Sequence, residues 1–313
     1  MSDEDFHPDL RLAARFLPRG TSPNHTRMRV MRALESIPRP SSVRAQDLRL
    51  DAGMSVRIYR PSAHTGRGPA LLWMHGGGYV MGSARQDDRY CRRFADALGL
   101  TVVSVNYRLA PEHPYPAALD DCRTAFDYLA GLPEVDPTRI AVGGMSAGAG
   151  LAAALAIGLR DQAAITPAYQ LLVYPMLDDR TGPAPHPHAD HFRLWDQASN
   201  IFGWRSYLGD VDPAIAVPAR QTDLSGLPPT WIGVGTLDLF YDEDLDYARR
   251  LRAAGVPCEF HTVDGAFHGF DEIMPNTTVA REFFTAQHAG LRAALAIDRP
   301  PDPALPPASR TDH

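Results

Sequence analysis

The sequence predicts an α/β protein with a mostly parallel central sheet flanked by helices. Between about residues 55 and 296, short apolar runs rich in β-formers alternate with helical stretches, which is typical of a parallel sheet covered on both faces. The chain has 313 residues and is 44% hydrophobic, so it is long enough to bury the core of one such domain together with an insertion.

The expected strands are apolar runs that turn signals separate. SVRIYRP alternates like a half-exposed strand, whereas PALLWMH and TVVSVNYR are apolar enough to be buried on both faces. The complete set of expected strands lies at 55–61, 69–75, 101–108, 140–142, 169–175, 230–235 and 258–265.

The expected helices lie between these strands. The stretches 87–99 and 118–131 have apolar residues at helical spacing, and each ends on a glycine that suits a helix C-terminus. An alanine-rich helix should follow the strand at 140–142, and 279–295 should close the domain as a strong helix. Two regions break the alternation. The first runs to about residue 45, where short amphipathic helices are expected at 7–17 and 25–37 with Pro/Gly breaks between them. The second, 180–218, is rich in Pro, His and aromatic residues.

Composition and charge exclude several classes of protein. A net charge of −6 and a pI near 6.0 argue against a nucleic-acid partner, which would require a clustered basic face. Cys91, Cys122 and Cys258 lack disulfide or zinc spacing. The acidic start MSDEDFHPDL differs from a secretory signal, and no apolar run approaches the ~18 residues of a membrane span. We therefore expect no membrane partner and a cytoplasmic location.

A GxSxG pentapeptide, residues 144–148, lies between the strand at 140–142 and the alanine-rich helix. A serine on such a sharp turn requires small neighbours, and the helix that follows supplies N–H groups and a positive dipole end. The alternative is a tightly packed, Gly-rich helix entry without catalytic function. The context favours Ser146 as a nucleophile.

A serine nucleophile needs a base and an acid that orients the base. Asp238 follows one buried strand and His268 follows the next, so both should reach the carboxyl edge of the sheet where Ser146 lies. His261 alternates within a strand and is the weaker candidate base. Other acids follow at the expected start of a helix, where carboxylates commonly serve as caps: Asp242, Glu243, Asp244 and Asp246.

Three consecutive glycines, residues 76–78, follow His75 at the end of an expected strand. Such a bare backbone could cradle a phosphate or form an oxyanion hole. HGGGYVMG has neither the lysine nor the spacing of phosphate-binding loops. An oxyanion hole requires a second N–H donor directly after the nucleophile, and Ala147 supplies one.

With these motifs the chain resembles the hormone-sensitive-lipase-like carboxylesterases, the bacterial family IV branch of the α/β-hydrolases. The resemblance covers nearly the whole chain and rests on HGGGYVMGS, VSVNYRLAPEHPYPAALDD, GMSAGAGLAAALA, LVYPMLDDR, the acid segment from residue 223, and HGF. It implies the α/β-hydrolase fold with a helical cap, a triad of Ser146, His268 and Asp238, and a small-molecule ester substrate. The resemblance also implies that the backbone N–H groups of Gly77, Gly78 and Ala147 are the oxyanion donors. It implies no cofactor and no metal.

By the same resemblance, the chain divides into five segments. They are 1–45, the N-terminal part of the cap; 46–179, the first part of the core; 180–218, the cap insertion; 219–297, the second part of the core; and 298–313, a Pro-rich tail expected to be disordered. A homodimer would fit the family.

This sequence departs from the family pattern at two places. Met145 stands where Asp or Thr usually precedes the nucleophile, and Leu239-Phe240 follows Asp238 where Pro-Leu is usual.

The cap insertion contains three histidines that are not expected to bind metal: His186, His188 and His191. The insertion also contains three aromatic residues that could line an acyl pocket or pack the cap on the core: Trp195, Phe202 and Trp204.

Two alternatives to an esterase stay open. One is a non-catalytic ligand-binding relative, and the other is an amidase or lactonase that uses the same triad.

Overall fold

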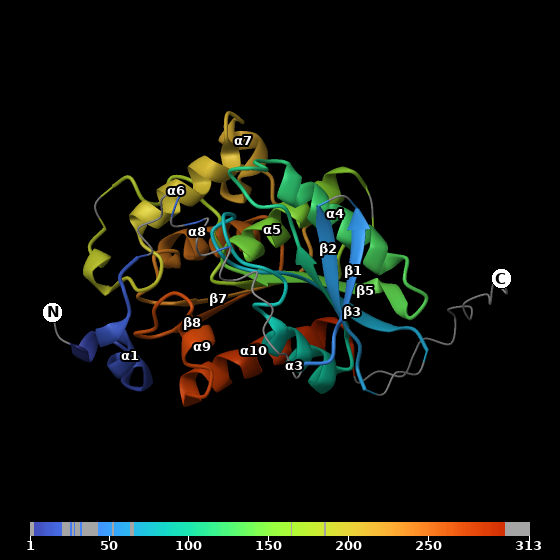
Figure 1. Cartoon of the computed structure of the whole chain (residues 1–313), viewed down its shortest axis with the longest axis horizontal. Coiled ribbons are helices and arrows are strands. Elements are labelled where there is room, and N and C mark those ends of the chain that lie inside the picture. The colour runs from blue at the N-terminus through green and yellow to red at the C-terminus, as the bar shows by residue number, and fades with distance from the viewer. Residues whose placement is uncertain are drawn as a thin grey trace.

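A central sheet of eight strands is covered by helices on both faces in the computed structural model (Figure 1). The structure describes residues 3–20, 26, 28, 32, 43–51, 53–62, 66–163, 165–184 and 186–297. The strands are β1 (Gln46–Asp51), β2 (Met54–Tyr59), β3 (Gly68–Met74), β4 (Thr101–Asn106), β5 (Val135–Met145), β6 (Tyr169–Val173), β7 (Thr230–Gly235) and β8 (Cys258–Val263).

The strand order is β1-β2-β4-β3-β5-β6-β7-β8. The pairs β1/β2 and β2/β4 are antiparallel, and all pairs from β4 to β8 are parallel. Because parallel strands end at the same edge, the loops after β3, β5, β7 and β8 meet at one rim of the sheet. We call these four loops the catalytic rim.

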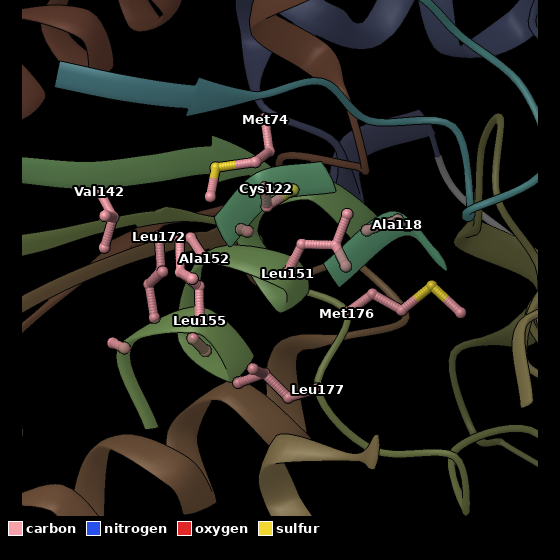
Figure 2. Close-up of a cluster of buried hydrophobic side chains, with 14 of the residues drawn as sticks. Met74, Ala118, Cys122, Val142, Leu151, Ala152, Leu155, Leu172, Met176 and Leu177 are labelled. Atoms are coloured by element: carbon pink, nitrogen blue, oxygen red, sulfur yellow. The ribbon is translucent and has the colours of Figure 1, made fainter. Parts of the chain in front are cut away.

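Helices of the core cover the two faces of the sheet in separate groups (Figure 1). One face carries α3 (Asp88–Leu98), α9 (Phe270–Ile273) and α10 (Thr278–Ala294), and the other carries α4 (Ala117–Ala130), α5 (Ala147–Asp161) and α8 (Tyr241–Ala253). Each face has its own cluster of buried apolar side chains. Figure 2 shows part of the cluster where α5 packs on the sheet, including Leu151, Leu155, Val142 and Leu172.

The predicted strands and long helices of the core are confirmed. α3 ends at Gly99, which has φ +68°, the left-handed conformation that favours glycine. Gly131 also ends a helix, but its φ of −83° is right-handed. The edge strand β1 was not predicted, because Leu48 and Leu50 are its only apolar residues. It is held by pairing with β2 and by packing of these two leucines against the core.

The two regions that break the alternation contain short helices. Residues 3–20 form η1 (Asp3–Asp5), η2 (Pro8–Leu10) and α1 (Arg11–Phe16), which agrees with the amphipathic helix expected near the start. Most of a second helix expected between residues 25 and 37, and the tail 298–313, lie outside the described residues. The region 180–218 contains η3 (Ala189–His191), α6 (Gln197–Leu208) and α7 (Pro213–Ala216), and η4 (Pro218–Arg220) follows.

Among the described residues, no helix has the length and apolar character that a membrane crossing requires.

Candidate active site

Ser146 lies on the sharp turn between β5 and α5. Its φ is +55° and its ψ −124°, a conformation that costs a non-glycine residue about 1–3 kcal/mol. Two backbone hydrogen bonds hold the turn: the Ser146 N–H donates to Val173 O at 2.9 Å, and the Met176 N–H donates to Ser146 O at 3.1 Å. The neighbouring strand β6 therefore fixes the strained conformation of the serine.

Close packing explains why Gly148 follows two residues after the serine. A Cβ on Gly148 would overlap the carbonyl groups of Met74 and His75 at the end of β3. The turn can approach β3 this closely only because residue 148 has no side chain. The GxSxG pattern thus reflects backbone contact between β3 and the start of α5.

Hydrogen bonds connect the three predicted catalytic residues. His268 Nδ1 lies 2.8 Å from Asp238 Oδ2, and His268 Nε2 lies 3.0 Å from Ser146 Oγ. The carboxylate acceptor requires Nδ1 to carry the proton, so Nε2 is left to accept from the serine hydroxyl. All three residues are buried, although Ser146 and His268 keep 5% and 8% of their surface exposed. The structure brings the sequence-predicted triad together.

The Asp238 carboxylate is oriented by the backbone that follows it. The Phe240 N–H donates to Asp238 Oδ1 at 3.0 Å, which leaves Oδ2 for His268. Two of the competing acids have other surroundings. Glu243 Oε1 accepts from the N–H groups of Leu177 and Asp178, and the Asp242 side chain is 79% exposed.

Two aromatic rings pack edge-on against the His268 imidazole. Tyr174 has its ring centroid 4.7 Å from that of His268, and the corresponding distance for Phe240 is 5.1 Å. Phe240 is one of the two residues that depart from the usual acid segment; its N–H donates to Asp238 and its ring contacts His268. This departure leaves the triad geometry intact.

A buried polar network behind the histidine was missed at the level of sequence. The Tyr174 hydroxyl donates to Asp271 Oδ1 at 2.9 Å, and the Tyr90 hydroxyl donates to Asp271 Oδ2 at 2.8 Å. Burial raises the pKa of Asp271, and the two hydroxyl donors oppose the shift. Tyr174 Oη also lies 3.8 Å from Sδ of Met145. No sequence spacing relates residues 90, 174 and 271, so only the tertiary structure reveals this network.

The three glycines after His75 lie beside Ser146. A Cβ on Gly76 would lie 3.5 Å from Ser146 Cβ. Gly77 and Gly78 have φ of +114° and +60°, values that favour glycine. Among the described residues, no backbone carbonyl accepts the N–H of Gly77 or Gly78. Ala147 is the first residue of α5, where N–H groups lack intrahelical partners. The three expected oxyanion donors thus come from the loop beside Ser146 and from the first turn of α5.

His75 lies beneath this loop and is fully buried. Its Nδ1 donates to Gly76 O at 2.7 Å, and its ring stacks on Tyr107 with centroids 4.1 Å apart. The Tyr107 hydroxyl in turn donates to His75 O at 2.8 Å. Burial lowers the pKa of His75 to about 4, so the imidazole is neutral at physiological pH. These contacts support the loop without placing a charge beside it.

Two histidines of the cap insertion have carboxylate partners. His191 Nε2 lies 3.0 Å from Asp5, and His186 Nε2 lies 3.7 Å from Asp242, so each has a carboxylate partner on a different element. Within the part of the chain that the structure describes, no group of three or more His, Cys, Asp or Glu residues has the geometry to hold a metal ion.

The family described as alpha/beta hydrolase fold matches residues 71–272. This stretch contains the glycine loop, the serine turn and both triad partners. The chain belongs to this family. Its resemblance to the hormone-sensitive-lipase-like branch and its predicted fold class are thereby confirmed.

Named relatives of the hydrolase are esterases. It is 39% identical over 257 residues to esterase LipI of Mycobacterium tuberculosis, which covers 77% of this chain and 80% of the relative. The crystal structure of esterase LipW from Mycobacterium marinum superposes with a TM-score of 0.81 at 35% identity, covering 94% of this chain and 97% of the other. A bacterial heroin esterase superposes with a TM-score of 0.82 at 33% identity, covering 94% of this chain and 99% of the other.

Proposed function

We propose that Ser146, His268 and Asp238 are the catalytic triad of this hydrolase and that it cleaves esters of carboxylic acids. The observation that carries the proposal is the continuous hydrogen-bond chain from Ser146 Oγ through His268 to Asp238, at a strained turn beside three glycines. The enzyme class agrees with its relatives: the protein is a carboxylic ester hydrolase, a carboxylesterase.

In the first half of the reaction, Ser146 Oγ attacks the ester carbonyl carbon while His268 Nε2 takes the hydroxyl proton. The carbonyl oxygen becomes an oxyanion, which accepts hydrogen bonds from the N–H groups of Gly77, Gly78 and Ala147. As the tetrahedral intermediate collapses, the C–O bond to the alcohol breaks and His268 gives its proton to the departing oxygen. Each oxyanion donor is worth roughly 10²-fold or more in rate.

In the second half, water attacks the acyl-enzyme and His268 accepts its proton. The second tetrahedral intermediate then releases the acid, and the proton returns to Ser146 Oγ. Asp238 remains ionised throughout and stabilises the imidazolium that forms twice in each cycle.

We further propose that the N-terminal segment 1–45 and the insertion 180–218 together form the cap over the rim. Contacts between the described parts of these segments support this assignment: the Leu194 N–H donates to Pro18 O at 2.8 Å, and Arg193 Nε donates to Ala14 O at 2.6 Å. A cytoplasmic location and a homodimer stay predictions; light scattering after size-exclusion chromatography tests the second.

Hydrolysis of p-nitrophenyl acetate and butyrate by wild type and by Ser146→Ala tests the function. We expect robust turnover by the wild type and a loss of roughly 10⁴-fold or more in the variant. Equal activity of the two proteins would remove Ser146 from the mechanism. A wild type that binds these esters without hydrolysing them would favour the ligand-binding alternative, and faster cleavage of matched anilides or lactones would favour an amidase or lactonase.

A further inference from the structure

Two consecutive residues of the insertion, Leu194 and Trp195, reach across the catalytic rim. They lie between η3 and α6, and we call this pair the roof. Trp195 is buried, and its ring lies against Gly78: a Cβ added to Gly78 would overlap the indole and lie 2.7 Å from Cζ2. Leu194 points to the other side of the site, where its Cδ1 would lie 3.4 Å from a Cβ on Gly269, the residue after the base.

The roof is held in a strained conformation by bonds on both sides. Leu194 has φ +67°, a value that is rare for residues other than glycine and costs about 1–3 kcal/mol. Its N–H donates to Pro18 O at 2.8 Å. The Trp195 Nε1–H donates to Asn200 Oδ1 at 3.3 Å, and the Asp196 side chain caps α6 by accepting the Ser199 N–H at 2.9 Å. The indole therefore has a fixed position.

Small residues make room for the indole. Gly78 lies on one side of it, and on α6 a Cβ added to Gly203 would lie 3.4 Å from Trp195 Cζ2 and 2.9 Å from Gly78 O. Met176, which follows the strand beside the nucleophile turn, completes this contact, with Cε 3.4 Å from the same added Cβ. Trp195 is thus wedged between the oxyanion loop and the cap helix.

The chemistry of ester cleavage assigns the two ends of the roof to different parts of a substrate. The alkoxy oxygen must lie near His268 Nε2, because the histidine protonates it as it leaves. The acyl chain leaves the carbonyl carbon in a different direction, away from the base. Leu194, beside Gly269, therefore lies on the alcohol side, and Trp195, against Gly78, lies on the acyl side.

We infer that Trp195 is a specificity-determining residue that restricts the hydrolase to esters of short-chain acids, whereas Leu194 contacts the alcohol. This inference rests on the proposed function of the triad. A wide, rigid indole at the acyl side would restrict the space for the acyl chain, and hydrophobic pockets discriminate roughly tenfold or more for each methylene that does not fit.

The test is a series of p-nitrophenyl esters from acetate to decanoate with wild type, Trp195→Ala and Trp195→Phe. We expect the ratio of kcat/KM for octanoate to kcat/KM for acetate to rise about tenfold or more in Trp195→Ala. A smaller rise in the same direction is expected in Trp195→Phe, which keeps an aromatic ring and so guards against a folding defect of the alanine variant.

Trp204→Phe is the matched control, because Trp204 belongs to the same insertion but packs on Tyr79 and Tyr207, with ring centroids 5.2 and 6.1 Å away. Its chain-length ratio should stay at the wild-type value. A second series, acetates of ethanol, butanol and hexanol, should respond to Leu194→Ala and not to Trp195→Ala. Alanine keeps a Cβ at residue 194, so the backbone strain there is retained.

The outcomes separate the inference from the proposed function. A wild type that hydrolyses none of these esters contradicts the proposed function itself. An active wild type whose acyl preference is unchanged in folded Trp195 variants overturns the inference alone. A Trp195 variant that changes the alcohol preference instead of the acyl preference also overturns it.

Discussion

The catalytic rim and the roof lie on opposite sides of the same site, and different forces hold them. In the rim, main-chain hydrogen bonds hold the loops after β5, β7 and β8: the Ser146 N–H donates to Val173 O of β6, and the Leu237 N–H donates to Ala266 O at 3.0 Å. The roof is positioned by side chains and by the distant segment 3–20. We therefore expect the rim to set the chemistry and the roof to set the substrate.

The largest effect should come from the rim. Asp238→Asn is expected to lower kcat by about 10⁴-fold, because an amide at this position favours the wrong tautomer of His268. The measurement is steady-state hydrolysis of p-nitrophenyl acetate. Asp242→Asn, at an exposed carboxylate four residues later, is the control and should retain wild-type activity. A loss below tenfold in Asp238→Asn would remove the residue from the triad.

A substitution where rim and roof touch should have the next largest effect. Gly78→Ala is expected to lower kcat by about 10²-fold, because the new Cβ collides with Trp195 and displaces an oxyanion donor. In a Trp195→Ala background the collision is relieved, and part of the activity should return. Since the strain at φ +60° remains, recovery should be incomplete. A double variant as inactive as Gly78→Ala would mean that strain alone explains the loss.

The stability of the folded protein should depend on pH through His75, which supports the glycine loop of the rim. Its folded pKa of about 4 lies below the unfolded value near 6.5, so the unfolded state binds more protons between these values. This contribution to stability is complete above pH 6.5 and is lost as the pH falls toward 4, by about 2–3 kcal/mol. Urea unfolding at several pH values measures it. His75→Gln should weaken the dependence without abolishing it, because burial also lowers the pKa of His288 to about 4. His113→Gln, at an exposed histidine, should leave the dependence unchanged.

The smallest effect is expected where the roof meets the N-terminal segment. Arg193 bonds Ala14 O and lies over the Phe6 ring, with Cζ 4.8 Å from the centroid. Arg193→Met should lower the free energy of unfolding by about 1 kcal/mol and raise KM more than it lowers kcat. Arg19→Met, at an exposed pair with Asp190, should cost well under about 1 kcal/mol. Equal effects of the two variants would argue that the segment contributes nothing specific to the roof.

Much of the rim could be predicted from the sequence because its signals are local. Glycines before and after Ser146, an acid directly after β7 and a histidine directly after β8 can each be recognised within a few residues, and the parallel sheet brings the loops to one edge. Edge strand β1 was missed because Leu48 and Leu50 are its only apolar residues. The sequence also left open whether Trp195 and Trp204 line an acyl pocket or pack the cap on the core. Helical spacing alone does not say which indole contacts the glycine loop, residues 76–78.

The sequence by itself determined the fold class and the strands from β2 to β8 in their order, and it led to the proposed triad of serine, aspartate and histidine, because each depends on patterns within one strand and the turn after it. The tertiary structure alone decided which partner each group has. Asp271 meets Tyr90 and Tyr174, and Trp195 meets Gly78, across separations that no local pattern encodes. These contacts form only when the sheet has brought its loops together, and they surround the reacting groups.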